Sequence, residues 1–314
     1  MASLWVDGKE ITCKGYRCAG SGEIEGELYY LANRDAYFMK QCKDKIVMID
    51  GRPDHRLYQD IFANEAKGFI TYDGHVNYTD CDIDQRELRA HVSNENKIPG
   101  VNIHVKDAVK MIKNDAKTAK IILKQDEGRG NSHNVIVDQP GTVDEWIIFT
   151  AHYDSAPLST GTYDNMSGCI ALLGILEHFI DKPHRYGLRF LWCGSEERGL
   201  LGSMAYCAQH EEELHKIVLN TNLDMIGSVM GRFVACSTAE DKLAHYIEYF
   251  ANELGFGMDS STGVYPSDST PMADKGIPAV TFAWSAPDNT ATVHNRYDTI
   301  EVVKAGQLKK ILTF

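Results

Sequence analysis

The stretch that decides the fold is Trp146-Ile147-Ile148-Phe149-Thr150-Ala151-His152-Tyr153-Asp154, an apolar run that ends in polar residues. A continuous apolar run of this length is typical of a strand buried on both faces. Similar runs follow at residues 188–193 and 217–223, and patterns typical of helices lie between them. The chain therefore alternates strand and helix in this region.

Apolar strands that alternate with helices of this kind form a largely parallel sheet with helices on both faces. The sequence thus predicts an α/β fold with a mostly parallel or mixed sheet sandwiched by helices. The predicted strands cover residues 146–151, 188–193, 217–223, 232–237 and 279–284, and the predicted helices cover 166–180, 200–210, 239–254 and a last segment from Glu301.

A change of pattern near residues 125–132 divides the chain. We expect a first domain at residues 1–128 and a catalytic domain at residues 129–314. The first domain reads as a small mixed α/β unit without a catalytic cluster. Its predicted strands lie at 45–50, 69–72, 101–105 and 120–124, and its predicted helices lie at 57–67 and 107–114.

The composition excludes several classes of partner. The formal net charge of −12 repels phosphate backbones and anionic membrane surfaces, so we expect neither nucleic acid nor a membrane as a partner. The longest apolar stretches are too short to cross a bilayer, and the start of the chain lacks a signal peptide pattern. The absence of a Cys-x-x-Cys pair among eight cysteines favours a cytoplasmic protein, whereas a trimmed N-terminus would allow secretion.

Residues that can bind metal ions follow the predicted strands. The carboxyl ends of parallel strands meet at one edge of a sheet, and ligands bind there. Loops that enter or leave neighbouring elements can reach the same edge. The metal-ligand candidates expected to converge are His152, Asp164, Glu197, Asp224 and His294, with Glu196 beside them.

Imidazole nitrogens and carboxylate oxygens bind zinc, and two metal ions about 3.5–4 Å apart need a carboxylate that bridges them. We interpret Asp164 as this bridge. His152 and Asp224 then complete the site of one ion. Glu197 and His294 complete the site of the other. The predicted cofactors are two Zn²⁺ ions, although other divalent metals would fit the same ligands.

Glu196 is adjacent to a ligand but is not needed as one. It can take a proton from a metal-bound water and return it to the leaving amine, as a general base and acid. Asp154 follows His152 by two residues and is placed to accept the second ring N–H of that imidazole. We therefore assign catalytic roles to Glu196 and Asp154.

Each of these residues also has a structural interpretation when taken alone. A histidine at a strand end is often a surface residue, Asp164 before Asn165 could cap a helix, and a Glu-Glu pair is often a solvated loop. The prediction depends on their joint position at one edge of the sheet. A serine nucleophile is disfavoured, because no histidine is arranged as a base beside Ser155 or Ser167.

At these residues the chain resembles the co-catalytic zinc exopeptidase family, which includes leucyl aminopeptidases, aminopeptidase Y and glutamate carboxypeptidase. The matching stretches are His152-Tyr153-Asp154-Ser155, Tyr163-Asp164-Asn165-Met166-Ser167-Gly168, Ser195-Glu196-Glu197-Arg198-Gly199-Leu200-Leu201-Gly202-Ser203, Asn222-Leu223-Asp224-Met225-Ile226-Gly227 and Val293-His294-Asn295-Arg296-Tyr297-Asp298-Thr299.

The resemblance implies the metal roles given above and a cis peptide bond between Asp164 and Asn165. It also implies that the first domain is a protease-associated-like domain, matched at residues 44–50, 63–72 and 98–101. One departure is Ser267-Asp268-Ser269, where many members have Ser-Asp-His, so contacts of Tyr265 with a substrate are left open.

The expected function is hydrolysis of peptide bonds by a metal-dependent exopeptidase, with an aminopeptidase favoured because the site is acidic. A carboxypeptidase or dipeptidase is the main alternative, and it would need Arg198 or Arg296 to pair with the substrate carboxylate. A glutaminyl cyclase is disfavoured by the first domain and the 164–168 pattern. An inactive binding homologue is disfavoured because all five ligands and Glu196 are present.

Overall fold

The computed structural model describes residues 1–287 and 290–313, which form two compact units, Met1–Arg129 and Gly130–Phe314. Each unit has its own apolar core. Among the described residues, no helix combines the length and the apolar character that a membrane span requires.

The first unit is a mixed sheet with short helices. Its strands pair in the order β2-β1-β8-β4-β5-β6-β7-β3, and β4 to β7 run parallel. The strands are β1 (Ala2–Val6), β2 (Lys9–Ile11), β3 (Cys13–Gly15), β4 (Gly22–Tyr30), β5 (Ile46–Met48), β6 (Gly68–Asp73), β7 (Gly100–His104) and β8 (Thr118–Leu123); the helices are α1 (Ala36–Lys40), α2 (His55–Ala63), α3 (Ala90–Ser93) and α4 (Val105–Lys113).

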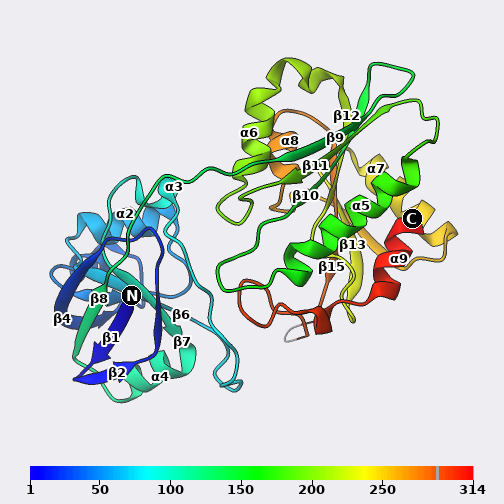
Figure 1. Cartoon of the computed structure of the whole chain (residues 1–314). Helices are drawn as coiled ribbons and strands as arrows, with labels where there is room; N and C mark the ends of the chain where they lie inside the picture. Colours follow the sequence, from blue (N-terminus) through cyan, green and yellow to red (C-terminus); the bar gives the residue numbers. More distant parts are fainter. Residues whose placement is uncertain (288–289, 314) are drawn as a thin grey trace. The chain divides into compact units, whose positions relative to one another are not determined.

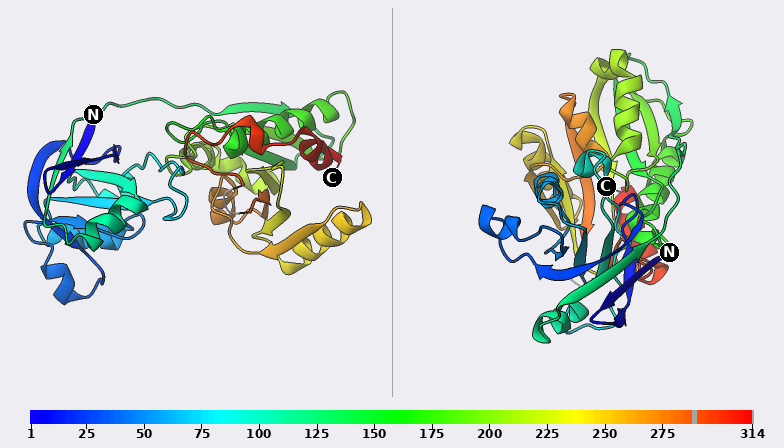
Figure 2. Two further views of the ribbon diagram at one scale, coloured as in Figure 1. Left: turned by 90° about the horizontal axis from the view of Figure 1, so that it is seen from below. Right: turned by 90° about the vertical axis from the view of Figure 1, so that its left-hand side faces the viewer.

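The second unit is built on a seven-stranded sheet (Figures 1 and 2). Its strand order is β14-β13-β15-β12-β10-β11-β9. The central strands β15, β12, β10 and β11 are parallel, while β9 and β13 are antiparallel to their neighbours β11 and β15. The strands are β9 (Val135–Gln139), β10 (Trp146–His152), β11 (Gly187–Cys193), β12 (Ile217–Leu223), β13 (Arg232–Ser237), β14 (Met258–Thr262) and β15 (Ala279–Ser285).

Helices cover both faces of this sheet. Successive residues of a strand point to opposite faces, so one strand contributes side chains to a core on each side. Phe190 of β11 packs in the core with Leu172 of α5 and Ile247 of α7, whereas Leu191 belongs to the core with Tyr206 of α6. The helical elements are η1 (Thr162–Met166), α5 (Ser167–Phe179), α6 (Leu201–Gln209), η2 (Glu211–Lys216), α7 (Asp241–Glu253), α8 (Ser269–Asp274), η3 (Ile300–Val302) and α9 (Ala305–Thr313). The predicted α/β fold with a mixed sheet between helices is confirmed.

Two glycines bring helices close to the strand ends. A Cβ on Gly168 at the start of α5 would lie 2.4 Å from the carbonyl oxygen of Leu223, the last residue of β12. A Cβ on Gly202 in α6 would lie 2.4 Å from the carbonyl oxygen of Gly194, just after β11. Contacts this short exclude any side chain, so glycine is needed for both close approaches.

Most elements expected from the sequence are present with shifted ends. The helix expected from Glu301 begins instead at Ala305, after the short turn η3. The strands β1 to β4, β9 and β14 and the helices α1, α3 and α8 were not predicted. Many are short and lack a strong apolar pattern, and β1 pairs with β8, which lies more than a hundred residues away along the chain. Such strands form because of their partners rather than because of their own sequence.

The two leucines in the middle of α5 allow a matched stability test. Leu172 is fully buried in the core, whereas Leu173 is 48% exposed. We expect Leu172→Ala to lower the free energy of unfolding of the second unit by about 2–5 kcal/mol. Leu173→Ala should change it by less than about 0.5 kcal/mol. Urea unfolding followed by tryptophan emission measures both variants, and equal effects would contradict the burial of Leu172.

Candidate metal centre

The parallel strands bring the expected site residues to one edge of the sheet. His152 is the last residue of β10, and Asp224 directly follows β12, its neighbour. Glu197 lies in the loop after β11, on the other side of β10. Asp164 lies in the turn η1 before α5, and His294 lies in the segment after β15. The peptide bond between Asp164 and Asn165 is cis, as the resemblance implies.

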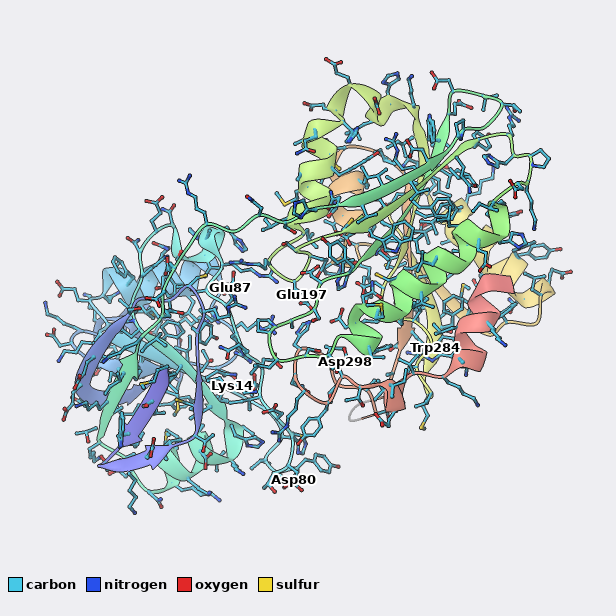
Figure 3. The ribbon with its side chains drawn as sticks, in the orientation of Figure 1. Lys14, Asp80, Glu87, Glu197, Trp284 and Asp298 are labelled. Atoms are coloured by element: carbon cyan, nitrogen blue, oxygen red, sulfur yellow. The ribbon has the colours of Figure 1, made fainter. Side chains whose placement is uncertain are left out.

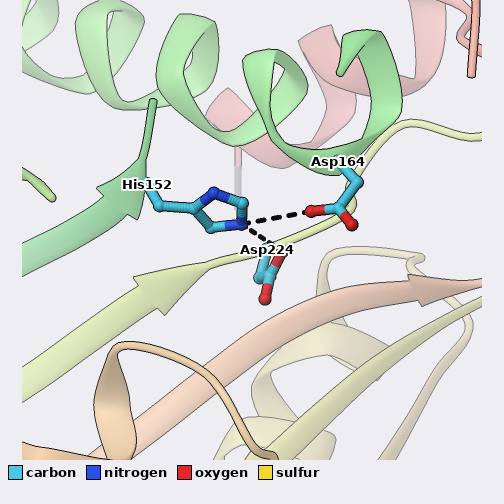
Figure 4. A group of neighbouring side chains, drawn as sticks. All are labelled: His152, Asp164 and Asp224. Carbon is cyan, nitrogen blue, oxygen red and sulfur yellow. Dashed lines mark ion pairs between the residues drawn. The ribbon is translucent and has the colours of Figure 1, made fainter. Parts of the chain in front are cut away.

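One group of ligand-type side chains joins β10, η1 and β12. Nε2 of His152 lies 3.1 Å from Oδ1 of Asp164 and 3.5 Å from Oδ1 of Asp224 (Figure 4). All three residues are buried, and their ligand atoms lie within 4.8 Å of one another. This spacing is compatible with a single metal ion.

A second group shares Asp164 with the first. Nε2 of His294 lies 3.2 Å from Oδ2 of Asp164 and 3.3 Å from Oε2 of Glu197, whose place in the unit is marked in Figure 3. The two oxygens of Asp164 therefore face different histidines. This is the arrangement that a bridging carboxylate requires.

Asn165 fixes the turn that carries Asp164 against the end of β12. Its amide nitrogen donates to the carbonyl oxygen of Leu223 at 2.8 Å, and its amide oxygen accepts from the backbone N–H of Met225 at 3.2 Å. These two residues flank Asp224. The side chain of Asn165 thus sets the position of Asp164 relative to Asp224.

Asp154 acts differently from the expectation. Nδ1 of His152 lies 3.1 Å from the backbone carbonyl oxygen of Asp154, and 3.7 Å from its carboxylate. The backbone therefore supplies the closer acceptor for the imidazole N–H. The carboxylate of Asp154 instead accepts from the backbone N–H groups of Glu196 and Glu197, at 2.9 and 3.3 Å. Asp154 thereby orients the loop that carries both glutamates.

Glu196 lies beside the first group without belonging to it. Its Oε2 is 4.0 Å from Nε2 of His152, and its side chain is 12% exposed. Burial, together with the nearby carboxylates of Asp224 and Asp268, raises the pKa of Glu196 to about 9, against the opposing charge of His152. A carboxyl with such a raised pKa in a buried cluster is suited to proton transfer.

The other charged residues of the site indicate which kind of ligand the site can bind. Burial, together with the neighbouring Asp164, raises the pKa of Glu197 to about 7. Burial alone would lower the pKa of His152, but the adjacent carboxylates of Asp154, Asp164 and Asp224 raise it well above its usual value. Oδ1 of Asp224 is buried and has no hydrogen-bond partner among the described residues. Carboxylates crowded in this way are stabilised by positive charge, so the residues fit bound divalent cations.

Polar side chains continue beneath the site. Asn222 of β12 accepts from Thr150 of β10 at 2.8 Å and donates to Ser267 at 2.9 Å. The hydroxyl of Ser269 lies 2.6 Å from the hydroxyl of Thr281, and both residues are buried. Burial and nearby acidic residues also raise the pKa of the half-buried Tyr265.

Two acidic residues gained no role from sequence reasoning. Asp298 is fully buried and accepts hydrogen bonds from backbone N–H groups of η1. Asp268 is also fully buried, and within the described part of the chain neither of its oxygens has a hydrogen-bond partner. They lie in the stretches 267–269 and 293–299. The residue type aspartate does not by itself predict that a carboxylate is buried or that it accepts from backbone N–H groups.

The buried Asp268 predicts an unusual pH dependence. Burial raises its pKa from 3.8 to about 6, with the charge of His152 acting against this rise and the charge of Asp224 acting in the same direction. The folded state thus binds this proton more tightly than the unfolded state. The resulting stabilisation is complete below about pH 4 and is lost as the pH rises through about 6.

We therefore expect Asp268→Asn to be more stable than the wild type above pH 7 by on the order of 3 kcal/mol, because the variant carries no charge to bury. The difference should vanish near pH 4. Chemical denaturation in the presence of a chelator at both pH values measures it. Asp274→Asn, at an exposed position of α8, is the control and should lack this dependence. A wild type more stable than Asp268→Asn at pH 8 would contradict the assignment.

Known aminopeptidases are similar to this chain in sequence. Aminopeptidase YwaD of Bacillus subtilis (strain 168) is 29% identical over 289 residues, which cover 87% of this chain and 61% of that protein. The present chain thus spans less than two thirds of the length of that relative. Leucine aminopeptidase 2 of Trichophyton equinum is 36% identical over 103 residues, or 32% of this chain and 19% of that protein.

Solved structures are similar over nearly the whole chain. The crystal structure of BSAP, a zinc aminopeptidase from Bacillus subtilis, superposes with a TM-score of 0.80 at 25% identity, covering 99% of this chain and 80% of that chain. An aminopeptidase from Aneurinibacillus sp. strain AM-1 has the same fold, with a TM-score of 0.79 at 20% identity, covering 99% and 78%.

The model of Peptidase family M28 matches residues 134–313, which contain every residue of both ligand groups as well as Glu196. The resemblance to co-catalytic zinc exopeptidases is thus confirmed, and the chain belongs to Peptidase family M28.

Proposed function

We propose that this protein is a zinc-dependent aminopeptidase, an exopeptidase that hydrolyses the peptide bond after a free N-terminal residue. The observation that carries the proposal is the pair of ligand groups that share Asp164, with the buried carboxyl of Glu196 beside them. The M28 family and relatives named as zinc aminopeptidases support this function.

In this proposal five side chains would hold two zinc ions. His152 and Asp224 would hold one ion and Glu197 and His294 the other, with Asp164 shared by both ligand groups. When bound, zinc ions lower the pKa of water and polarise a carbonyl group.

The chain's own residues move the proton and hold the site in place. Glu196 accepts a proton from the attacking water at its carboxylate and donates it to the amine that leaves. Asp154 holds the backbone N–H of Glu196 at 2.9 Å, which restricts where that carboxylate can reach.

The acidic site favours recognition of an N-terminal ammonium over a C-terminal carboxylate. A carboxypeptidase would need a basic side chain free to pair with the substrate carboxylate. Arg296, one candidate for that role, packs over the ring of Tyr297 at 4.9 Å and donates to its hydroxyl at 3.0 Å. An aminopeptidase needs no such cation.

We further propose that residues 1–128 form a protease-associated-like domain and that residues 129–314 form the peptidase domain. The compact unit Met1–Arg129, with its mixed sheet and separate core, supports this assignment. The peptide substrate would be bound through the residues of the second domain listed above.

Substituting Glu196 separates catalysis from metal binding. We expect Glu196→Gln to keep the zinc content of the wild type and to lose turnover by roughly 10²–10⁴-fold, because only the proton carrier is removed. Glu197→Gln is the matched neighbour and should lose zinc, since it removes a proposed ligand. Zinc content by elemental analysis and kcat on an aminoacyl substrate distinguish the two. Near-normal turnover by Glu196→Gln would refute the proposed mechanism.

A substrate panel tests the direction of cleavage. We expect hydrolysis of peptides with a free N-terminus, no hydrolysis of the same peptides after N-acetylation, and loss of activity with a chelator that zinc restores. C-terminal amidation should have little effect. Cleavage of the acetylated peptides that depends on a free C-terminus would instead identify a carboxypeptidase.

A further inference from the structure

The carboxylate of Asp298 holds two successive backbone amides of the turn η1. Its Oδ1 accepts from the N–H of Tyr163 at 2.7 Å, and its Oδ2 accepts from the N–H of Asp164 at 3.0 Å. The residue is fully buried, so neither bond competes with water. Both peptide planes that lead into Asp164 are therefore fixed by one side chain.

Asp298 is linked both to the segment before η1 and to the segment that carries His294. The hydroxyl of Thr160, just before η1, donates to the backbone carbonyl of Asp298. Asp298 also lies four residues after His294, whose Nε2 is 3.2 Å from Oδ2 of Asp164. The segment 294–298 thus contacts Asp164 through the side chain of His294 and contacts Thr160 through the backbone of Asp298. Asp298 is labelled in Figure 3.

Asp164 is the member that both ligand groups share. Its Oδ1 faces His152 and its Oδ2 faces His294. A small displacement of its backbone would move both oxygens together. A displacement of Asp224 or Glu197 would affect only the group to which that residue belongs.

We propose that Asp298 is a positioning residue that sets the backbone of Asp164 and thereby the metal affinity of both groups at once. This inference rests on the proposed metal centre. Outer partners that orient metal ligands typically contribute about 10–100-fold to metal affinity. Asp298 differs from the usual outer partner because it holds the ligand by its backbone amide and by that of the preceding residue.

Asp298→Asn is the sharpest test, because it keeps the shape of the side chain. An amide offers one acceptor oxygen and one N–H₂ donor group, so one of the two backbone N–H groups would face another donor. We expect the dissociation constants of both zinc-binding events to rise together by about 10–100-fold. Titration of the metal-free full chain against a chromophoric chelator measures both constants.

Two further variants distinguish positioning from general loss of stability. Glu197→Gln removes a ligand of one group and should weaken one binding event far more than the other. Tyr206→Phe removes a buried hydroxyl that accepts from Arg189 at 2.8 Å, at the opposite end of β11 from the site. It should lower the melting temperature of the metal-free protein while both zinc constants stay unchanged.

The inference is overturned if Asp298→Asn binds both zinc ions as tightly as the wild type, or weakens only one of them. If Asp298→Asn does not fold, Thr160→Val provides the milder test, since it removes only the hydroxyl that anchors the backbone of Asp298. Thr160→Val should raise the dissociation constants of the two zinc-binding events by the same factor as each other. Unchanged dissociation constants would overturn the inference. A wild type that binds no zinc would refute the metal centre itself, which is a distinguishable result.

Discussion

The constraint on which the second unit depends is the burial of several carboxylates beside two histidines at one sheet edge. Each carboxylate raises the free energy of the charged forms of the other carboxylates, so each needs compensating hydrogen bonds or cations. The unit supplies many of these bonds from backbone amides. Asp154 accepts from the amides of Glu196 and Glu197, and Asp298 accepts from those of Tyr163 and Asp164. The same bonds that lower the cost of burial also orient the site.

The sequence predicted the parts of the fold that carry a strong local pattern. The long apolar strands β10, β11 and β12 and the helix α5 were expected, and the polar residues at the strand ends indicated which edge of the sheet holds the site. The strands β1 to β4 of the first unit were not expected, because they lack a strong local apolar pattern and because β1, β3 and β4 pair with strands far along the chain. For β1 the partner is β8, so the stabilising hydrogen bonds are not visible in a local window.

The same distinction holds within the site. His152, Asp164, Glu197, Asp224 and His294 could be grouped because their residue types are those that bind metals, and because strand order brings them together. The structural importance of Asp298 could not be read in that way, since its partners are backbone N–H groups that every residue type offers. The fully buried Asp268 is similar, because burial is a property of the fold.

The excess of negative charge also bears on the chemistry of the substrate. A cluster that needs cations to offset Asp164, Asp224 and Glu197 attracts the ammonium of a peptide N-terminus and repels the carboxylate of a C-terminus. Burial and the neighbouring carboxylates also raise the pKa of Glu196, against the opposing charge of His152. One electrostatic feature therefore favours metal binding, proton transfer to a leaving amine and a preference for free N-termini. These three properties together support the proposal of an aminopeptidase.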